Sequence, residues 1–223
     1  GGPMDLAAAL NGLGGRPIPE VMAGLNQVEE VIAALTEVPP KDARVGLWKA
    51  LARLVGALGG EGADQMLARA RTMQTASLVL QADLAAQEGV ADLGALISLV
   101  QGCTGFMCAA LAQLAPGGGV GEDMVGEVLQ AAQICLQCVH DVATRLADLC
   151  LGSLEGLEGL CECIFSTFEQ ALSVASLGST SAPDERFKQL DAMALGALKQ
   201  FTELLDASIF PAVTAAAKEG GGG

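Results

Sequence analysis

Cysteine and histidine are the residues of this sequence whose types and spacing could hold a metal ion. A tetrahedral zinc site needs thiolates or imidazoles that converge on one point, and Cys135, Cys138 and His140 lie close together in the chain. Their flanks, however, are apolar residues in a helical pattern and lack the turn residues of a zinc knuckle. Cys161 and Cys163, two positions apart on a helix, point about 200° away from each other. We therefore expect buried core cysteines and no metal site.

A thiol nucleophile activated by the single histidine is the second chemistry to weigh. Cys138 and His140 are two residues apart, and such neighbours on a helix do not face each other. The glycine clusters lack the Lys-Ser/Thr and strand context of a phosphate-binding loop. The sequence thus predicts a protein that is not an enzyme and that binds no cofactor. An enzymatic reading stays open as a third hypothesis, with its nucleophile among four thiols: Cys135, Cys138, Cys161 and Cys163.

The net charge and its distribution along the chain indicate which kinds of partner the protein could bind. A net charge of −14 over 223 residues argues against affinity for nucleic acid or for anionic membranes, since both require clustered Lys and Arg. Basic residues gather between Lys41 and Arg71, whereas Arg145 is the only basic residue from Thr72 to Ala182. In the amphipathic helix predicted from Lys41 to Leu58, the pattern places the basic residues largely off the apolar face, namely Lys41, Arg44, Lys49 and Arg53. We expect the basic helix to lie near acidic helices. The acidic face of the second half is then left for solvent or for a basic partner.

Cysteine usage bears on the cellular compartment. All seven cysteines fall between Cys103 and Cys163, and an odd number within helical patterns suits a reducing compartment better than a secreted disulfide scaffold. Residues 1–15 show neither a basic leader region nor a long apolar run, so we expect no signal peptide. The predicted location is cytoplasmic.

The stretch Gly94–Gly121 carries no formal charge and must be hidden from water. Its apolar side chains fall on all sides of a helix, which is typical of a buried central helix or of a membrane span. Polar residues such as Ser98 and Gln101 interrupt it, and no Lys or Arg flanks either end. We therefore expect the centre of a bundle and no membrane span. Gly102 and Gly105 are predicted to permit close contact with neighbouring helices.

Apolar residues at spacings of three and four predict helices throughout, and no stretch shows strand alternation. Short turns between long helices favour an all-α, antiparallel bundle of six to seven helices, several longer than twenty residues, with a buried uncharged central helix. Pro211 is expected to kink or interrupt the last helix, and Ser181 and Asp184 to form a capping box before it. The absence of a fixed-period repeat counts against a solenoid. The predicted helical ranges are Met4–Leu13, Ile18–Leu35, Lys41–Leu58, Glu61–Gln87, Val90–Ala115, Gly121–Leu149, Leu154–Leu177, Pro183–Ile209 and Ala212–Lys218.

A glycine-rich joint divides the chain almost in half and sets the predicted domain organisation. Either one bundle or two bundles that share a seam would fit it. Residues 1–3 resemble a cloning remnant and the terminal glycines a linker scar. The predicted segments are 1–17 as an N-terminal remnant with a short helix, 18–115 as the first helical half, 116–121 as the connection, 122–218 as the second helical half and 219–223 as a flexible tail.

What the sequence lacks favours a binding role over chemistry. Ala-rich amphipathic helices with few aromatic residues resemble, in general texture, the bundles of talin, vinculin and their relatives, although no motif assigns the chain to that family. We predict a non-enzymatic interaction, scaffold or adaptor module that docks another protein, with a basic one suiting its acidic surface. The alternative is a carrier of a lipid or hydrophobic peptide in a core lined by Met66, Met73 and Met107. The sequence leaves the oligomeric state open.

Overall fold

The computed structural model describes the chain except for residues 1–4, 61, 119–120, 150–156, 180–184 and 221–223. All regular structure in the described residues is helical. The α-helices are α1 (Leu6–Asn11), α2 (Ile18–Ala33), α3 (Lys41–Ala57), α4 (Ala63–Ala86), α5 (Leu93–Leu114), α6 (Val125–Thr144), α7 (Leu146–Leu149), α8 (Leu157–Ser176), α9 (Glu185–Leu204) and α10 (Phe210–Gly220). Shorter turns are the 3₁₀ segments η1 (Glu122–Met124) and η2 (Leu177–Ser179) and the π-helical segment η3 (Leu205–Ile209).

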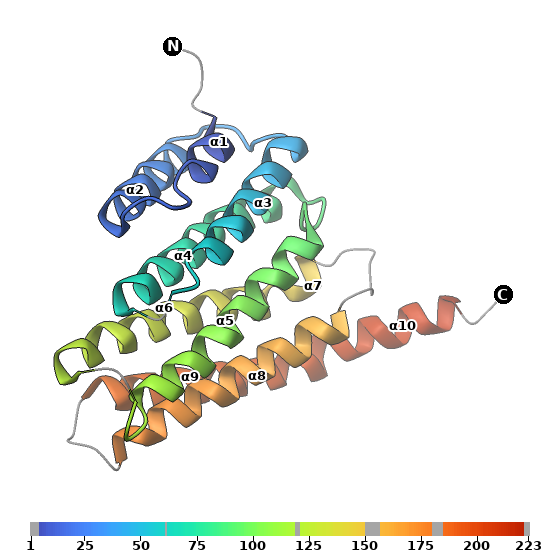
Figure 1. Ribbon diagram of the computed structural model, residues 1–223. Coiled ribbons are helices and arrows are strands. Elements are labelled where there is room, and N and C mark those ends of the chain that lie inside the picture. Colours follow the sequence, from blue (N-terminus) through green and yellow to red (C-terminus); the bar gives the residue numbers. More distant parts are fainter. Residues whose placement is uncertain (1–4, 61, 119–120, 150–156, 180–184, 221–223) are drawn as a thin grey trace.

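The helices form two layers of stacked hairpins (Figure 1). One layer holds α1, α3, α5 and α8, the other holds α2, α4, α6 and α9, and each helix packs on the next within its layer. Contacts across the layers pair α1 with α2, α3 with α4, α5 with α6 and α8 with α9. This arrangement confirms the predicted all-α antiparallel bundle. The helical hairpins are stacked as in solenoid proteins, although the sequence shows no repeat of fixed period.

The uncharged helix α5 touches α3, α4, α6 and α8, in agreement with the predicted buried central helix. Its buried face carries eight apolar residues, among them Leu96, Phe106 and Met107. The opposite face is exposed, and it consists of small or uncharged polar residues, namely Gly94, Ser98, Gln101, Gly105, Cys108 and Ala112. Among the described helices, α5 alone has the length and composition to cross a membrane, but its apolar face packs against the other helices.

Two of the three glycines of α5, Gly102 and Gly105, behave differently. A Cβ atom at Gly102 would lie 3.4 Å from both Met73 Cε and Val55 Cγ1, so this position is a close contact between helices, as predicted. A Cβ atom at Gly105 would meet nothing within 4 Å. The prediction of close packing at Gly105 is therefore wrong, because the residue lies on the exposed face of the helix.

Helix α6 ends earlier than the sequence pattern indicated. One helix was predicted through Leu149, but Arg145 leaves the helical conformation with φ −118° and ψ 11° and separates α6 from the short α7. Thr144 Oγ1 donates to the carbonyl of Asp141 at 3.2 Å. A hydroxyl that bonds to the preceding turn competes with the helical backbone bonds, which offers a reason for the break.

The last helix is deformed ahead of Pro211 and does not end there. Pro211 has no N–H to donate to the carbonyl four residues before it. The five residues of η3 widen into a π-helical turn, in which the N–H of Phe210 donates to the carbonyl of Leu205, and α10 then continues. The predicted interruption thus takes the form of a π segment. The predicted capping box of Ser181 and Asp184 lies outside the described residues.

A buried ionic network ties α3 to the end of α4. Arg44 Nη1 donates to Asp83 Oδ1 at 2.6 Å, and Trp48 Nε1 donates to Asp83 Oδ2 at 2.7 Å. Arg44 Nη2 also meets Glu88 Oε2 at 2.9 Å. The prediction that the basic helix lies near acidic helices is met only by these two carboxylates, because α1 and α5, which also pack on α3, carry no charge and α4 carries as many Arg as Asp. The sequence pattern placed Arg44 off the apolar face of its helix, which is wrong, since only 2% of Arg44 is exposed.

Candidate functional site

The structure separates the cysteines and the histidine that sequence spacing had brought together. Cys135 lies in the core, 3.5 Å from Met73 Sδ. Cys138 is also buried, at the contact between α6 and α4, with its Sγ 3.7 Å from Ser77 Oγ. His140 turns towards α9, where its Nε2 lies 2.7 Å from Gln200 Oε1. Across the described residues, no three His, Cys, Asp or Glu side chains form a group that could hold a metal ion.

Four of the described thiols have a raised pKa. A hydrogen bond with Cys135, followed by burial, keeps the pKa of Cys103 well above its ordinary value. Burial is the main cause that raises the pKa of Cys138, Cys161 and Cys163. Since the thiolate is the nucleophilic form, these four residues are poor candidates for a catalytic centre.

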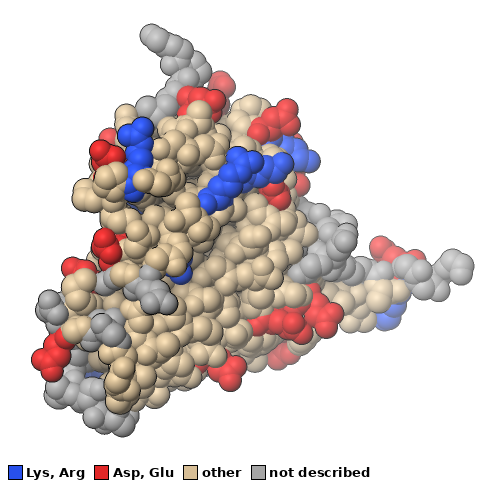
Figure 2. Space-filling view, viewed as in Figure 1, with Lys and Arg blue, Asp and Glu red and all other residues tan. Residues whose placement is uncertain are grey.

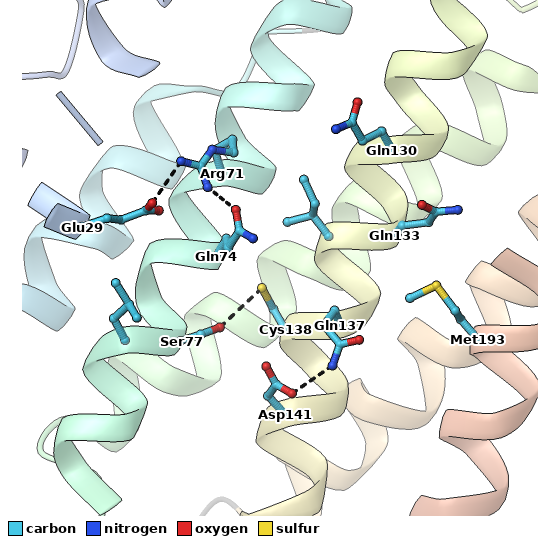
Figure 3. Close-up of a pocket in the computed structure, with 12 residues that line it drawn as sticks. Glu29, Arg71, Gln74, Ser77, Gln130, Gln133, Gln137, Cys138, Asp141 and Met193 are labelled. Carbon is cyan, nitrogen blue, oxygen red and sulfur yellow. Dashed lines mark hydrogen bonds and ion pairs between the residues drawn. The ribbon is translucent and has the colours of Figure 1, made fainter. Parts of the chain in front are cut away.

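A groove lined mostly by polar residues runs between α4 and α6, in the layer that also holds α2 and α9 (Figure 3), with a volume of about 600 Å³. Helix α4 supplies Gln74 and Ser77 to one wall, and helix α6 supplies an amide-rich wall opposite. Glu29 of α2 and Met193 of α9 border the groove. The side chains from α6 are Gln130, Gln133, Ile134, Gln137, Cys138 and Asp141.

Ion pairs and hydrogen bonds fix the α2 edge of this groove. Arg71 Nη2 lies 3.1 Å from Glu29 Oε2 and 2.6 Å from Asn26 Oδ1, while its Nη1 contacts Gln74. Thr75 Oγ1 donates to the other oxygen of Glu29 at 2.7 Å. The charges of Arg71 and Glu29 are thus largely satisfied within the protein. The side-chain amides are the groups that remain available to hydrogen-bond a ligand in the groove.

The wall from α6 offers an uncharged row of hydrogen-bonding groups. Among the residues that the structure describes, Gln130 and Gln133 have no side-chain hydrogen-bond partner, and Gln137 Nε2 donates to Asp141 Oδ1 at 3.0 Å. A carboxamide presents two donors and an acceptor, so the row can pair with the N–H and C=O groups of a polypeptide. From Gln130 to Gln137 the row of amides spans about 10 Å along the helix axis. The spacing of these glutamines by three and four residues is visible in the sequence, but a pattern along one helix does not show that a second wall from α4 faces it.

A second groove lies between α8 and the segment formed by η3 and α10, with a volume of about 490 Å³. Its lining is almost wholly apolar, and the two carboxylates that border it, Glu158 and Glu162, are exposed. Cys161, one of the sequence candidates, lies here among apolar side chains. The other lining residues are Leu157, Phe165, Leu205, Ile209, Phe210 and Val213.

Comparison with known proteins adds no function to this geometry: no protein-family model, no curated protein and no solved structure matches the chain.

Proposed function

We propose that this chain is a non-enzymatic protein-interaction module, an adaptor or scaffold, that holds a polypeptide segment of a partner in the groove between α4 and α6. The observation that carries the proposal is the row of glutamine amides along α6, open to solvent and opposed by Gln74 and Ser77 of α4. Stacked helices commonly use such extended surfaces for binding. Amide side chains suit a polypeptide backbone because each can donate and accept at once.

The ionisable groups around the groove favour binding over catalysis. A general base must reach its proton with a free, suitably tuned group, yet Glu29 is paired with Arg71 and hydrogen-bonded by Thr75. Asp141 accepts a bond from Gln137. The pKa of the Cys138 thiol is raised by burial, so it is a weak nucleophile.

The carrier hypothesis has less support. It requires the methionine face to line a space for an apolar ligand. Met66, Met73 and Met107 are at most 1% exposed and belong to the packed core, and none of them lines either groove described above. Native mass spectrometry of the protein purified from its source would test this alternative, which predicts co-purifying mass of lipid or peptide size.

The proposal is tested by placing charge in the groove. The double variant Gln133→Lys/Gln137→Lys should lose a partner that wild type retains in quantitative affinity purification from its source cells, because two ammonium groups displace the amide row. Gln101→Lys, on the exposed face of α5 in the other layer, is the matched control and should retain the same partner. A set of bound proteins that is identical for all three chains would contradict the proposal.

The remaining expectations belong to the same proposal. A cytoplasmic, helical scaffold would bind protein and not nucleic acid, in keeping with its net charge of −14. A partner with basic residues would suit the acidic surface.

A further inference from the structure

We infer that the groove between α8 and the η3–α10 segment, called the C-terminal groove below, is a second docking site, and that it takes an amphipathic helix of a partner protein with Lys or Arg beside its apolar face. The site lies on other elements than the glutamine-lined groove. The inference therefore goes beyond the proposed function and can fail independently of it.

One wall is a second apolar stripe on α8. Leu157, Cys161 and Phe165 follow one another at intervals of four residues and all line the C-terminal groove. They are partly exposed, whereas Leu160, Ile164 and Phe168 of the same helix are fully buried in the core. Helix α8 thus has more apolar surface than its own bundle covers.

The opposite wall is shaped by the π-helical turn. Leu205 and Ile209 are buried at the base of the groove, while Phe210 is 53% exposed and Val213 is half-buried one turn further on. Figure 1 shows α10 extending past the end of α8 at which Leu157 lies, towards the C-terminus of the chain. An exposed phenylalanine beside a concave apolar surface is typical of a binding anchor.

Charge selects the kind of partner. Glu158 and Glu162 are exposed, repeat the four-residue interval of the apolar stripe and border the groove. Figure 2 shows acidic atoms gathered over the part of α8 that lies near α10. Lys218, the basic residue of α10, is not among the residues that line the groove. Two carboxylates about 6 Å apart along the helix axis match basic residues one turn apart on a docked helix.

A helix fits this site better than an extended strand. The stripe from Leu157 to Phe165 runs about 12 Å, or roughly two helical turns, and a groove between two helices accepts the ridge of side chains on a third. A strand would need an open backbone edge to pair with, and the helices α8 and α10 satisfy their own backbones. The expected occupant is therefore an amphipathic helix of about three turns.

The test uses a fluorescein-labelled peptide of about 14 residues with Leu at spacings of three and four and Lys beside them. Its affinity is measured by fluorescence anisotropy. Phe210→Glu should weaken binding at least about tenfold by placing a charge in the apolar groove. Leu195→Glu, which alters a residue equally exposed at 52% but outside the groove, should bind like wild type. Circular dichroism of both variants checks that the fold is retained.

The charge is tested on both molecules. Replacing the peptide's Lys by Glu, or using Glu158→Lys/Glu162→Lys, should each weaken binding about tenfold, and combining the two changes should restore part of it. The Gln133→Lys/Gln137→Lys variant should bind the Lys peptide normally, which separates this inference from the proposed function. Equal binding by wild type and Phe210→Glu would overturn the inference. So would self-association of the chain that Phe210→Glu abolishes, since the occupant would then be a second copy.

Discussion

Asp83 illustrates how single polar residues hold this bundle together. Its side chain is fully buried and accepts from Arg44, from Trp48 and, at 3.2 Å, from the backbone N–H of Ala91. We expect Asp83→Ala to lower the free energy of unfolding by about 3 kcal/mol or more, because it leaves the buried Arg44 without its close partner. Urea unfolding measures this loss.

Glu88 provides the comparison for that variant. It binds the same arginine at 2.9 Å, but its side chain is 58% exposed. Solvent screens such a pair, so Glu88→Gln should cost no more than about 1 kcal/mol. Equal losses for Asp83→Ala and Glu88→Gln would show that burial does not decide the strength of the network.

The buried thiols predict a stability that falls at alkaline pH. In the unfolded chain a thiol ionises near pH 8.5 (about its reference pKa), whereas the pKa of Cys103 and of Cys138 is raised in the folded protein. Above about pH 8.5 the unfolded chain therefore binds fewer protons than the folded one. Stability should fall by about 1.4 kcal/mol per pH unit for each such thiol until the folded pKa is reached.

Cys138→Ala isolates one of these thiols. Urea unfolding between about pH 9 and 10 should show a pH slope smaller by about one proton than that of wild type. The chain contains no Tyr, which removes one other group that titrates in this range. An unchanged slope in Cys138→Ala would mean that this thiol does not contribute to the alkaline loss.

At the residue scale the sequence predicted burial of cysteines better than pairing of charges. The apolar pattern around Cys135 and Cys138 correctly indicated the core. Burial of Cys161 and Cys163 was predicted wrongly, because Leu160, Ile164 and Phe168 fill the core face of α8 and leave these two thiols partly exposed. Arg44 was misplaced, because its partner Asp83 lies 39 residues away and only the packing of α3 on α4 brings the two together. A periodicity along one helix carries no information on such a distant partner.

At the scale of one helix, substitutions at Gly102 and Gly105 of α5 are expected to change the free energy of unfolding in opposite directions. Gly105→Ala should raise the free energy of unfolding by up to about 1 kcal/mol, since alanine favours the helix and the site is open. Gly102→Leu should lower it by about 1–3 kcal/mol, because Met73 and Val55 leave room for little more than a Cβ atom. Thermal unfolding of the two variants distinguishes the positions. A loss of stability in Gly105→Ala would indicate a contact at the exposed face.

The same helix shows where the sequence pattern was ambiguous. The exposed residues of α5 are small or uncharged, so that its solvent face differs from its core face in size more than in polarity. A hydropathy pattern therefore could not orient the helix. Pro211 gave a clearer signal, but it could not reveal that the chain would form a π turn and continue, which depends on the packing of Leu205 and Ile209.

For the molecule as a whole, helix existence followed from sequence and helix arrangement did not. The two layers of stacked hairpins arise from contacts between helices that share no sequence repeat. No local sequence pattern therefore predicts which helices pack against each other. Both grooves lie between helices distant in sequence, such as α4 with α6 and α8 with α10. The sequence contains the residues that line each groove, but it does not show which residues from distant helices face one another there.

The stacked arrangement also bears on whether the predicted halves, 18–115 and 122–218, unfold together. One continuous set of buried residues runs through all the long helices, and α4 packs on α6 across the middle of the stack. There Met73 Sδ lies 3.0 Å from Cys103 Sγ on α5 and 3.5 Å from Cys135 Sγ on α6. Separate unfolding would expose this buried seam to water, at a cost in hydrophobic free energy.

We therefore expect a single cooperative transition. Trp48, the only tryptophan, is 1% exposed and lies in α3, so its fluorescence reports on the first half, whereas far-ultraviolet circular dichroism reports on every helix. The two urea midpoints should coincide, as they do when no intermediate is populated. Met73→Ala, which opens a cavity at the seam, should lower both midpoints together. Midpoints that separate, in wild type or in this variant, would show instead that the halves are independent bundles joined at 116–121.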